Sequence, residues 1–85
     1  MTIAAARDLS SRGVRVMTIA PGIVDTPMLG RVSEEFRSAL AESVPFPHRL
    51  ARPDEYAKLA GMIVEHDYLN GETIRMDGAL RMAPR

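Results

Sequence analysis

The segment from Val14 to Ala20 constrains the fold more than any other part of the chain. It reads VRVMTIA and is rich in β-branched and apolar residues. A nearly continuous apolar run of this length is typical of a strand buried on both faces of a parallel sheet. We expect the strand to end at Pro21 and Gly22, because proline cannot donate a ladder hydrogen bond and glycine permits backbone angles that other residues avoid.

A second strand is predicted near the carboxyl end, between Glu72 and Asp77. In this segment Ile74 and Met76 alternate with polar neighbours, which is the pattern of a strand covered on one face. An Asn-Gly dipeptide precedes the segment and an Asp-Gly dipeptide ends it, and both dipeptides favour turns.

Three helices are predicted around these strands, over residues 1–12, 34–43 and 53–66. Gly13 closes the first, Ser33 is an N-cap for the second, and Pro53 suits the first position of the third. The apolar stripes are Ile3, Ala6 and Leu9; Phe36, Ala39, Leu40 and Val44; and Tyr56, Leu59, Ala60, Ile63 and Val64. The order helix, strand, helix, helix, strand implies a parallel pair of strands joined by a right-handed helical crossover, so the fold class is α/β.

The size of the chain limits the core that it can build. Its 85 residues include two phenylalanines, two tyrosines and no tryptophan. A domain of this size buries only about 60% of the surface that its unfolded chain exposes. We therefore expect another surface to cover part of its apolar faces.

Composition excludes several classes of function. Eleven basic residues balance eleven acidic ones, so no net charge favours a nucleic acid or a membrane surface. No apolar run is long enough to span a bilayer, and the first residues do not resemble a secretory signal. The chain has no cysteine, which excludes thiolate chemistry and favours a cytoplasmic location. His48 and His66 have no second ligand at the spacing of a metal site, so no metal is expected.

Four short strings, in order and in register, resemble the last third of the classical short-chain dehydrogenases/reductases. They are RGVRV at 12–16, PGIVDTP at 21–27, RPDEYA at 52–57 and NGETIRMDG at 70–78. Two further strings, VPFPHRL at 44–50 and DGALRM at 77–82, look like the type 2 3-hydroxyacyl-CoA dehydrogenases, a subgroup of that family. Ala79, where many family members have glycine, agrees with this subgroup. The resemblance implies that residues 1–85 are the C-terminal part of a single Rossmann-like, doubly wound parallel domain.

The resemblance also shows which parts of an oxidoreductase these residues lack. The sequence contains neither the glycine-rich turn that receives a cofactor pyrophosphate nor a tyrosine-x-x-x-lysine pair. Lys58 lies two residues after Tyr56, about 200° around a helix, and cannot lower the pKa of its phenol. We therefore assign no catalytic residue. The complete enzyme is expected to use NAD or NADP, and the 85 residues alone are not expected to turn over substrate or to bind the cofactor firmly.

The resemblance assigns cofactor contacts to the loop after the first strand. The backbone of Pro21, Gly22 and Ile23 and the hydroxyl of Thr26 would hold the nicotinamide carboxamide. This agrees with the rule that doubly wound sheets bind ligands beyond the carboxyl ends of their strands. Considered without the family, Pro21 and Gly22 are a simple turn and Thr26 is a local capping hydroxyl.

The resemblance places a substrate-covering segment next to this loop. Met28, Leu29, Phe36 and Leu40 would line the site of an acyl chain or another alcohol substrate, and ordinary core packing explains the same residues equally well. The third helix and the last strand commonly form a subunit interface in this family, so a homo-oligomer is expected. The alternative to an oxidoreductase fragment is a non-catalytic interaction module, or a truncated product, that associates through these two elements.

Overall fold

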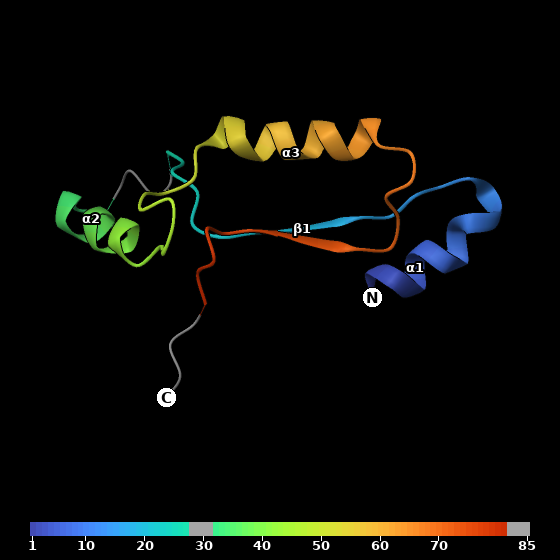
Figure 1. The fold of residues 1–85 in the computed structure, drawn as a ribbon, viewed down its shortest axis with the longest axis horizontal. Coiled ribbons are helices and arrows are strands. Elements are labelled where there is room, and N and C mark those ends of the chain that lie inside the picture. The colour runs from blue at the N-terminus through green and yellow to red at the C-terminus, as the bar shows by residue number, and fades with distance from the viewer. Residues whose placement is uncertain (28–31, 82–85) are drawn as a thin grey trace.

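The computed structural model describes residues 1–27 and 32–81. The elements in chain order are α1 (Thr2–Leu9), the 3-10 helix η1 (Ser10–Arg12), β1 (Thr18–Pro21), α2 (Glu34–Glu42), α3 (Pro53–Glu65) and β2 (Thr73–Met76). The molecule is elongated, with extents of 50 × 31 × 21 Å, and α1 and α2 lie at its opposite ends (Figure 1). The order of helices and strands is the one predicted from the sequence.

Strands β1 and β2 pair in parallel, which confirms the predicted topology. Thr18 lies opposite Thr73, and Pro21 lies opposite Met76. The 51 residues from 22 to 72, including α2 and α3, therefore form the crossover between two neighbouring parallel strands. Both strands end at the same edge, so the loops that follow them come together there.

Strand β1 is shorter at its start than the sequence predicted. Residues 14–17 run beside the chain ahead of β2, but the contact at Val16 is made partly by a side chain. The Val16 amide donates to Oδ1 of Asn70 at 2.9 Å, and its carbonyl accepts from the Gly71 amide at 2.8 Å. Regular pairing begins only at Thr18, whose amide donates to the Glu72 carbonyl at 3.0 Å.

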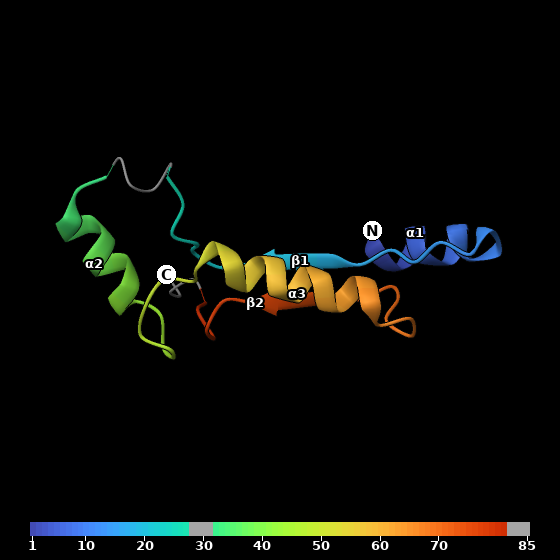
Figure 2. The ribbon, with the colours of Figure 1, turned by 90° about the horizontal axis from the view of Figure 1, so that it is seen from above.

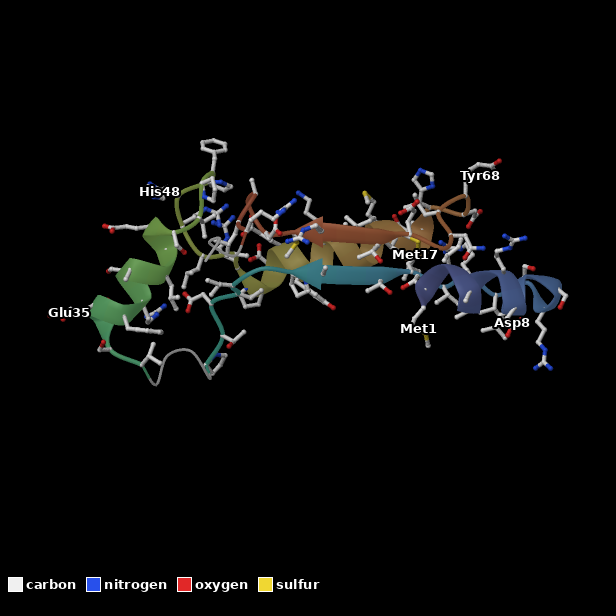
Figure 3. All side chains as sticks on the ribbon, turned by 90° about the horizontal axis from the view of Figure 1, so that it is seen from below. Met1, Asp8, Met17, Glu35, His48 and Tyr68 are labelled. Carbon is white, nitrogen blue, oxygen red and sulfur yellow. The ribbon has the colours of Figure 1, made fainter. Side chains whose placement is uncertain are left out.

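Burial of β1 on both faces, as predicted, is wrong for the described residues. Helix α3 covers one face of the two strands (Figures 1 and 2), and this face carries Ile19, Ile74 and Met76. The opposite face, seen in Figure 3, carries Thr18 and Arg75, and both are exposed. No second layer of the described residues covers that face along its length, because α1 reaches only its amino end, through a hydrogen bond between Thr2 and Thr18.

The core is thin, as the size of the chain predicted. Only four apolar residues are buried among those described, namely Ala6, Val44, Leu50 and Ile63. On α3 the predicted apolar stripe is covered at Leu59, Ala60 and Ile63, but Tyr56 and Val64 stay exposed, the latter at 71%. In the part of the chain that is described, no helix is long and apolar enough to cross a membrane.

Helix α3 is fixed over the sheet by one side chain from the segment before β1. The Arg15 guanidinium donates four hydrogen bonds of 2.9–3.1 Å to carbonyls at or just beyond the end of α3, those of Ile63, Val64, His66 and Leu69. The last carbonyls of a helix lack the usual partners one turn further on, and here, among the described residues, the Ile63 carbonyl has only the His66 amide, at 3.3 Å, beside Arg15. A cation at this end also favours the helix dipole. Arg15 therefore caps α3 and ties it to the start of the first strand.

Replacing Arg15 with methionine should destabilise the chain by about 2 kcal/mol, because the carbonyls at the end of α3 lose a charged donor. Urea unfolding followed by circular dichroism measures the change. Arg12→Met, at an exposed arginine three residues earlier, should change the free energy of unfolding by less than about 0.5 kcal/mol. Equal stability of the two variants would show that the cap contributes nothing.

Candidate functional site

The loop after β1 is held in place by pairing with the segment that precedes α3. The Ala51 amide donates to the Ile23 carbonyl at 3.0 Å, and the Asp25 amide donates to the Ala51 carbonyl at 2.8 Å. Val24 and Ala51 form the corresponding parallel bridge. Residues 23–25 are therefore fixed by backbone hydrogen bonds, and Thr26, which is half-buried, follows directly.

Pro21 presents its carbonyl away from β2. The amides of Thr18 and Gly22 donate to carbonyls of the β2 segment, so the alternate residues Ile19 and Pro21 direct their peptide groups to the other edge of β1. Proline has no amide hydrogen to offer there. The edge of β1 that faces away from β2 therefore offers the Pro21 carbonyl as an acceptor. It offers no N–H at Pro21 to which a further strand could pair.

Gly22 permits the close approach of the two chain segments that leave the strands. A Cβ atom at Gly22 would lie 2.7 Å from the Asp77 Cβ and 2.9 Å from its Cα. The Gly22 amide also donates to the Met76 carbonyl at 2.9 Å. Glycine is thus required here by backbone packing, beyond its role in ending a strand.

The Asp77 carboxylate organises the turn after β2. It accepts hydrogen bonds from Arg75 at 2.8 and 3.0 Å, from Arg81 at 3.1 Å and from the Ala79 amide at 3.1 Å. The Arg75 hydrogen bond, with help from the Ala79 amide, holds the pKa of the Asp77 carboxyl below its ordinary value although burial opposes this shift. Ala79 adopts a φ of 70°, a left-handed conformation in which glycine is less strained.

A second carboxylate anchors the start of α3. Glu55 receives two hydrogen bonds from the Arg49 guanidinium, at 2.8 and 3.0 Å, and one from the Arg52 amide at 2.8 Å. These hydrogen bonds lower the pKa of Glu55 to about 2, the Arg49 side chain being the larger cause. Because Ala51 lies between the two arginines, this cluster also fixes the residue that pairs with the loop after β1.

A cavity of about 560 Å³ opens between α3 and the carboxyl ends of the strands. Its walls include Ile23 from the loop, Leu59 and Met62 from α3, Met76 from β2, and Asp77. Lys58 lines this cavity as well, whereas Tyr56 on the same helix is 40% exposed and does not. No tyrosine–lysine pair forms here, as their spacing predicted.

The residues predicted to contact the cofactor are near neighbours in sequence, whereas the described residues predicted to line the substrate site do not line the cavity. Pro21 is the last residue of β1, and Gly22, Ile23 and Thr26 follow it in the loop at the carboxyl edge of the sheet. Phe36 is 53% exposed, and Leu40 is half-buried; neither lines the cavity. The two other residues expected there, Met28 and Leu29, lie outside the described residues.

Sequence reasoning missed the charged residues that support the loop. Glu55 and Asp77 were not singled out, although two signals pointed to them. Glu55 stands three residues after Arg52, at the spacing of a capping box, and Asp77 precedes a glycine at the end of a strand. Their arginine partners could not be identified from these patterns.

Comparison with known proteins gives the same family along nearly the whole chain. A family model described as "Enoyl-(Acyl carrier protein) reductase" matches residues 1–80. The chain belongs to the short-chain dehydrogenase/reductase family. It is 57% identical over 84 residues to a 3-hydroxyacyl-CoA dehydrogenase type-2 of Drosophila melanogaster and 55% identical to that of Homo sapiens, with 99% of this chain covered in each case.

A solved structure of the same kind confirms the fold. The crystal structure of 3-hydroxyacyl-CoA dehydrogenase type-2 from Mycobacterium avium superimposes with a TM-score of 0.91 at 52% sequence identity and covers 99% of this chain. The resemblance to the short-chain dehydrogenases and to their type 2 subgroup is thus confirmed. The chain spans about a third of the length of these relatives.

Substituting Gly22 with alanine should destabilise the chain by about 1–3 kcal/mol, because the added methyl group meets the Asp77 backbone. Gly61→Ala is the matched control. Gly61 lies inside α3 with nothing within 4 Å of an added Cβ, so alanine should stabilise the chain by about 0.5–1 kcal/mol. Urea unfolding of both variants measures the two changes in the free energy of unfolding. A neutral or stabilising Gly22→Ala would mean that the segments at Gly22 and Asp77 are further apart than the structure shows.

Stability should fall as the solution is acidified, in part through Glu55. Its pKa is lowered from 4.5 to about 2, so the stabilisation is fully present above pH 4.5 and disappears as the pH falls through about 2. Urea midpoints measured between pH 7 and pH 2 should show this loss. Glu55→Gln should start from a lower stability and flatten the curve between pH 5 and pH 2, and an unchanged slope would contradict the assignment.

Proposed function

We propose that this chain forms the nicotinamide-binding loop, the substrate-covering helix and a subunit-interface region of an NAD(P)-dependent 3-hydroxyacyl-CoA dehydrogenase. Two observations support the proposal. Relatives named 3-hydroxyacyl-CoA dehydrogenase type-2 are 54–57% identical to it over 84 residues. In addition, Pro21 ends β1 and the loop from Gly22 to Thr26 follows it, at the edge of the sheet where ligands of such folds bind. The predicted cytoplasmic location stays a prediction.

The donors and acceptors of the loop fit a carboxamide. Pro21 offers a carbonyl at the open edge of β1, suited to accept from the amide nitrogen of the ligand. Ile23 belongs to the same alternate set and offers a backbone N–H, suited to donate to the amide oxygen. The half-buried hydroxyl of Thr26 can add a further hydrogen bond of either sense.

Bound nicotinamide would supply the hydride acceptor for a secondary alcohol. The contribution of this chain would be orientation, because a carboxamide held at two backbone groups and one hydroxyl cannot turn its ring over without losing these hydrogen bonds. Gly22 and Asp77 keep the loop in place, and the pairing of Ala51 with residues 23–25 does so from the other side. Phe36, Leu40, Met28 and Leu29 are proposed to cover the acyl chain.

Replacing the matching third of the Mycobacterium avium relative with this chain tests the proposal. The hybrid should reduce NAD in the presence of a 3-hydroxyacyl-CoA, whereas the 85 residues alone should give no turnover. Thr26→Val should raise the KM for NAD by about three- to thirtyfold, the effect of one lost hydrogen bond, while Thr73→Val on the exposed strand face should leave it unchanged. A correctly folded hybrid without activity would refute the proposed function.

A second candidate function is self-association through α3 and β2. Two apolar residues of α3 that do not line the cavity are exposed, Tyr56 at 40% and Val64 at 71%. Among the described residues, β2 pairs on one edge only, and an unpaired edge favours association with another chain. These features support a homo-oligomer, in a complete enzyme or as a non-catalytic module.

Val64→Asp should shift the molecular mass measured by light scattering toward that of a monomer, because it places a charge in the proposed contact. Val14→Asp changes an exposed valine outside α3 and β2 and should leave the mass unchanged. A parent chain that is monomeric at all accessible concentrations would exclude this function.

A further inference from the structure

An ion pair joins the loop after β1 to helix α2. Nη2 of Arg37 lies 2.6 Å from Oδ1 of Asp25, and the two side chains are 28% and 42% exposed. Glu34 is a much weaker second partner, because its Oε1 lies 3.6 Å from Nη1 of Arg37 and its side chain is 89% exposed. The contact between Arg37 and Asp25 is therefore the dominant charge interaction of Arg37.

Asp25, the acidic residue of this ion pair, is held in place by backbone contacts. The Asp25 amide is bound to the Ala51 carbonyl, and Ala51 lies between the arginines whose contacts with Glu55 anchor the start of α3. Asp25 also immediately precedes Thr26. The position of the Asp25 side chain is therefore coupled to the backbone segment that carries the proposed carboxamide contacts.

Arg37, the basic residue of the ion pair, belongs to helix α2, which has few other contacts with the rest of the chain. Helix α2 has nine residues and, among those described, none of them is buried. A helix of this length is marginal without tertiary contacts. A surface depression of about 350 Å³ lies between α2 and the rest of the chain. It is lined by Arg37, Ser38 and Ala41 on α2 and by Asp25 and Leu50 on the other side. The ion pair is accordingly a main link between this helix and the loop.

We propose that Asp25 and Arg37 are positioning residues that hold α2 closed over the substrate side of the nicotinamide loop. This inference rests on the proposed function and assigns to these two residues a role that acts through the position of α2. Loss of the ion pair leaves the chemistry of hydride transfer unchanged but allows α2 to move away, so binding of the acyl-CoA weakens. The expected effect is on the KM for the acyl-CoA, with little change in kcat.

The test uses the hybrid enzyme described above and four variants. Arg37→Gln and Asp25→Asn should each raise the KM for a 3-hydroxyacyl-CoA by about two- to fivefold, the range of a partly exposed ion pair. The exchange of both charges, Asp25→Arg with Arg37→Asp, should restore most of the loss. Glu34→Gln is the matched control, because it removes only the exposed second partner, and should keep the parent KM.

Salt dependence separates an electrostatic role from simple damage to the fold. Raising the ionic strength from about 0.1 to 1 M shortens the screening length from about 10 to 3 Å. It should therefore raise the KM of the parent enzyme toward that of Arg37→Gln, while that variant changes less. Hydrogen exchange followed by mass spectrometry should show faster exchange of the α2 amides in Arg37→Gln and Asp25→Asn, but not in Glu34→Gln.

The outcomes distinguish this inference from the proposed function. An active hybrid in which Arg37→Gln and Glu34→Gln behave alike, or in which charge exchange restores nothing, overturns the positioning role and leaves the proposed function intact. A folded hybrid with no activity refutes the proposed function, and the hydrogen-exchange comparison still decides whether the ion pair holds α2.

Discussion

The parallel pairing of β1 with β2 is the constraint on which the rest of the structure depends. Two parallel strands cannot be joined by a tight turn, so the chain between them must leave one end of the sheet and return at the other. Helix α3 makes that return across one face of the strands, and Arg15 caps its far end with four hydrogen bonds. Because both strands end at the same edge, Gly22 and Asp77 are forced into contact there.

This contact connects the fold to the proposed chemistry. The loop that follows Gly22 is held by Ala51 on one side and packed against Asp77 on the other. Asp77 and Glu55 are in turn fixed by arginines, so neither carboxylate is free to act as a proton acceptor near neutral pH, and the lowered pKa values agree with this structural role. In the proposed function the described residues would therefore orient a ligand, and neither of these two carboxylates would transfer a proton.

Local sequence patterns predicted the helices and strands well, but they did not predict the contacts between residues that are distant in sequence. The parallel strands, the Ser33 cap and the start of α3 at Pro53 follow from spacing and turn chemistry. The contacts of Arg15 span 48 to 54 residues, and no periodic signal marks which of several arginines would make them. Phe36 was placed in an apolar stripe, yet it is 53% exposed, because periodicity gives the face of a helix and not what covers it.

The most direct test of the account is a crystal structure of the hybrid enzyme with NAD bound. It should show β1 and β2 parallel, with Thr18 opposite Thr73, and the nicotinamide carboxamide within hydrogen-bonding distance of the Pro21 carbonyl and the Ile23 amide. A carboxamide bound away from residues 21–26, or strands that run antiparallel or lie apart, would contradict the account.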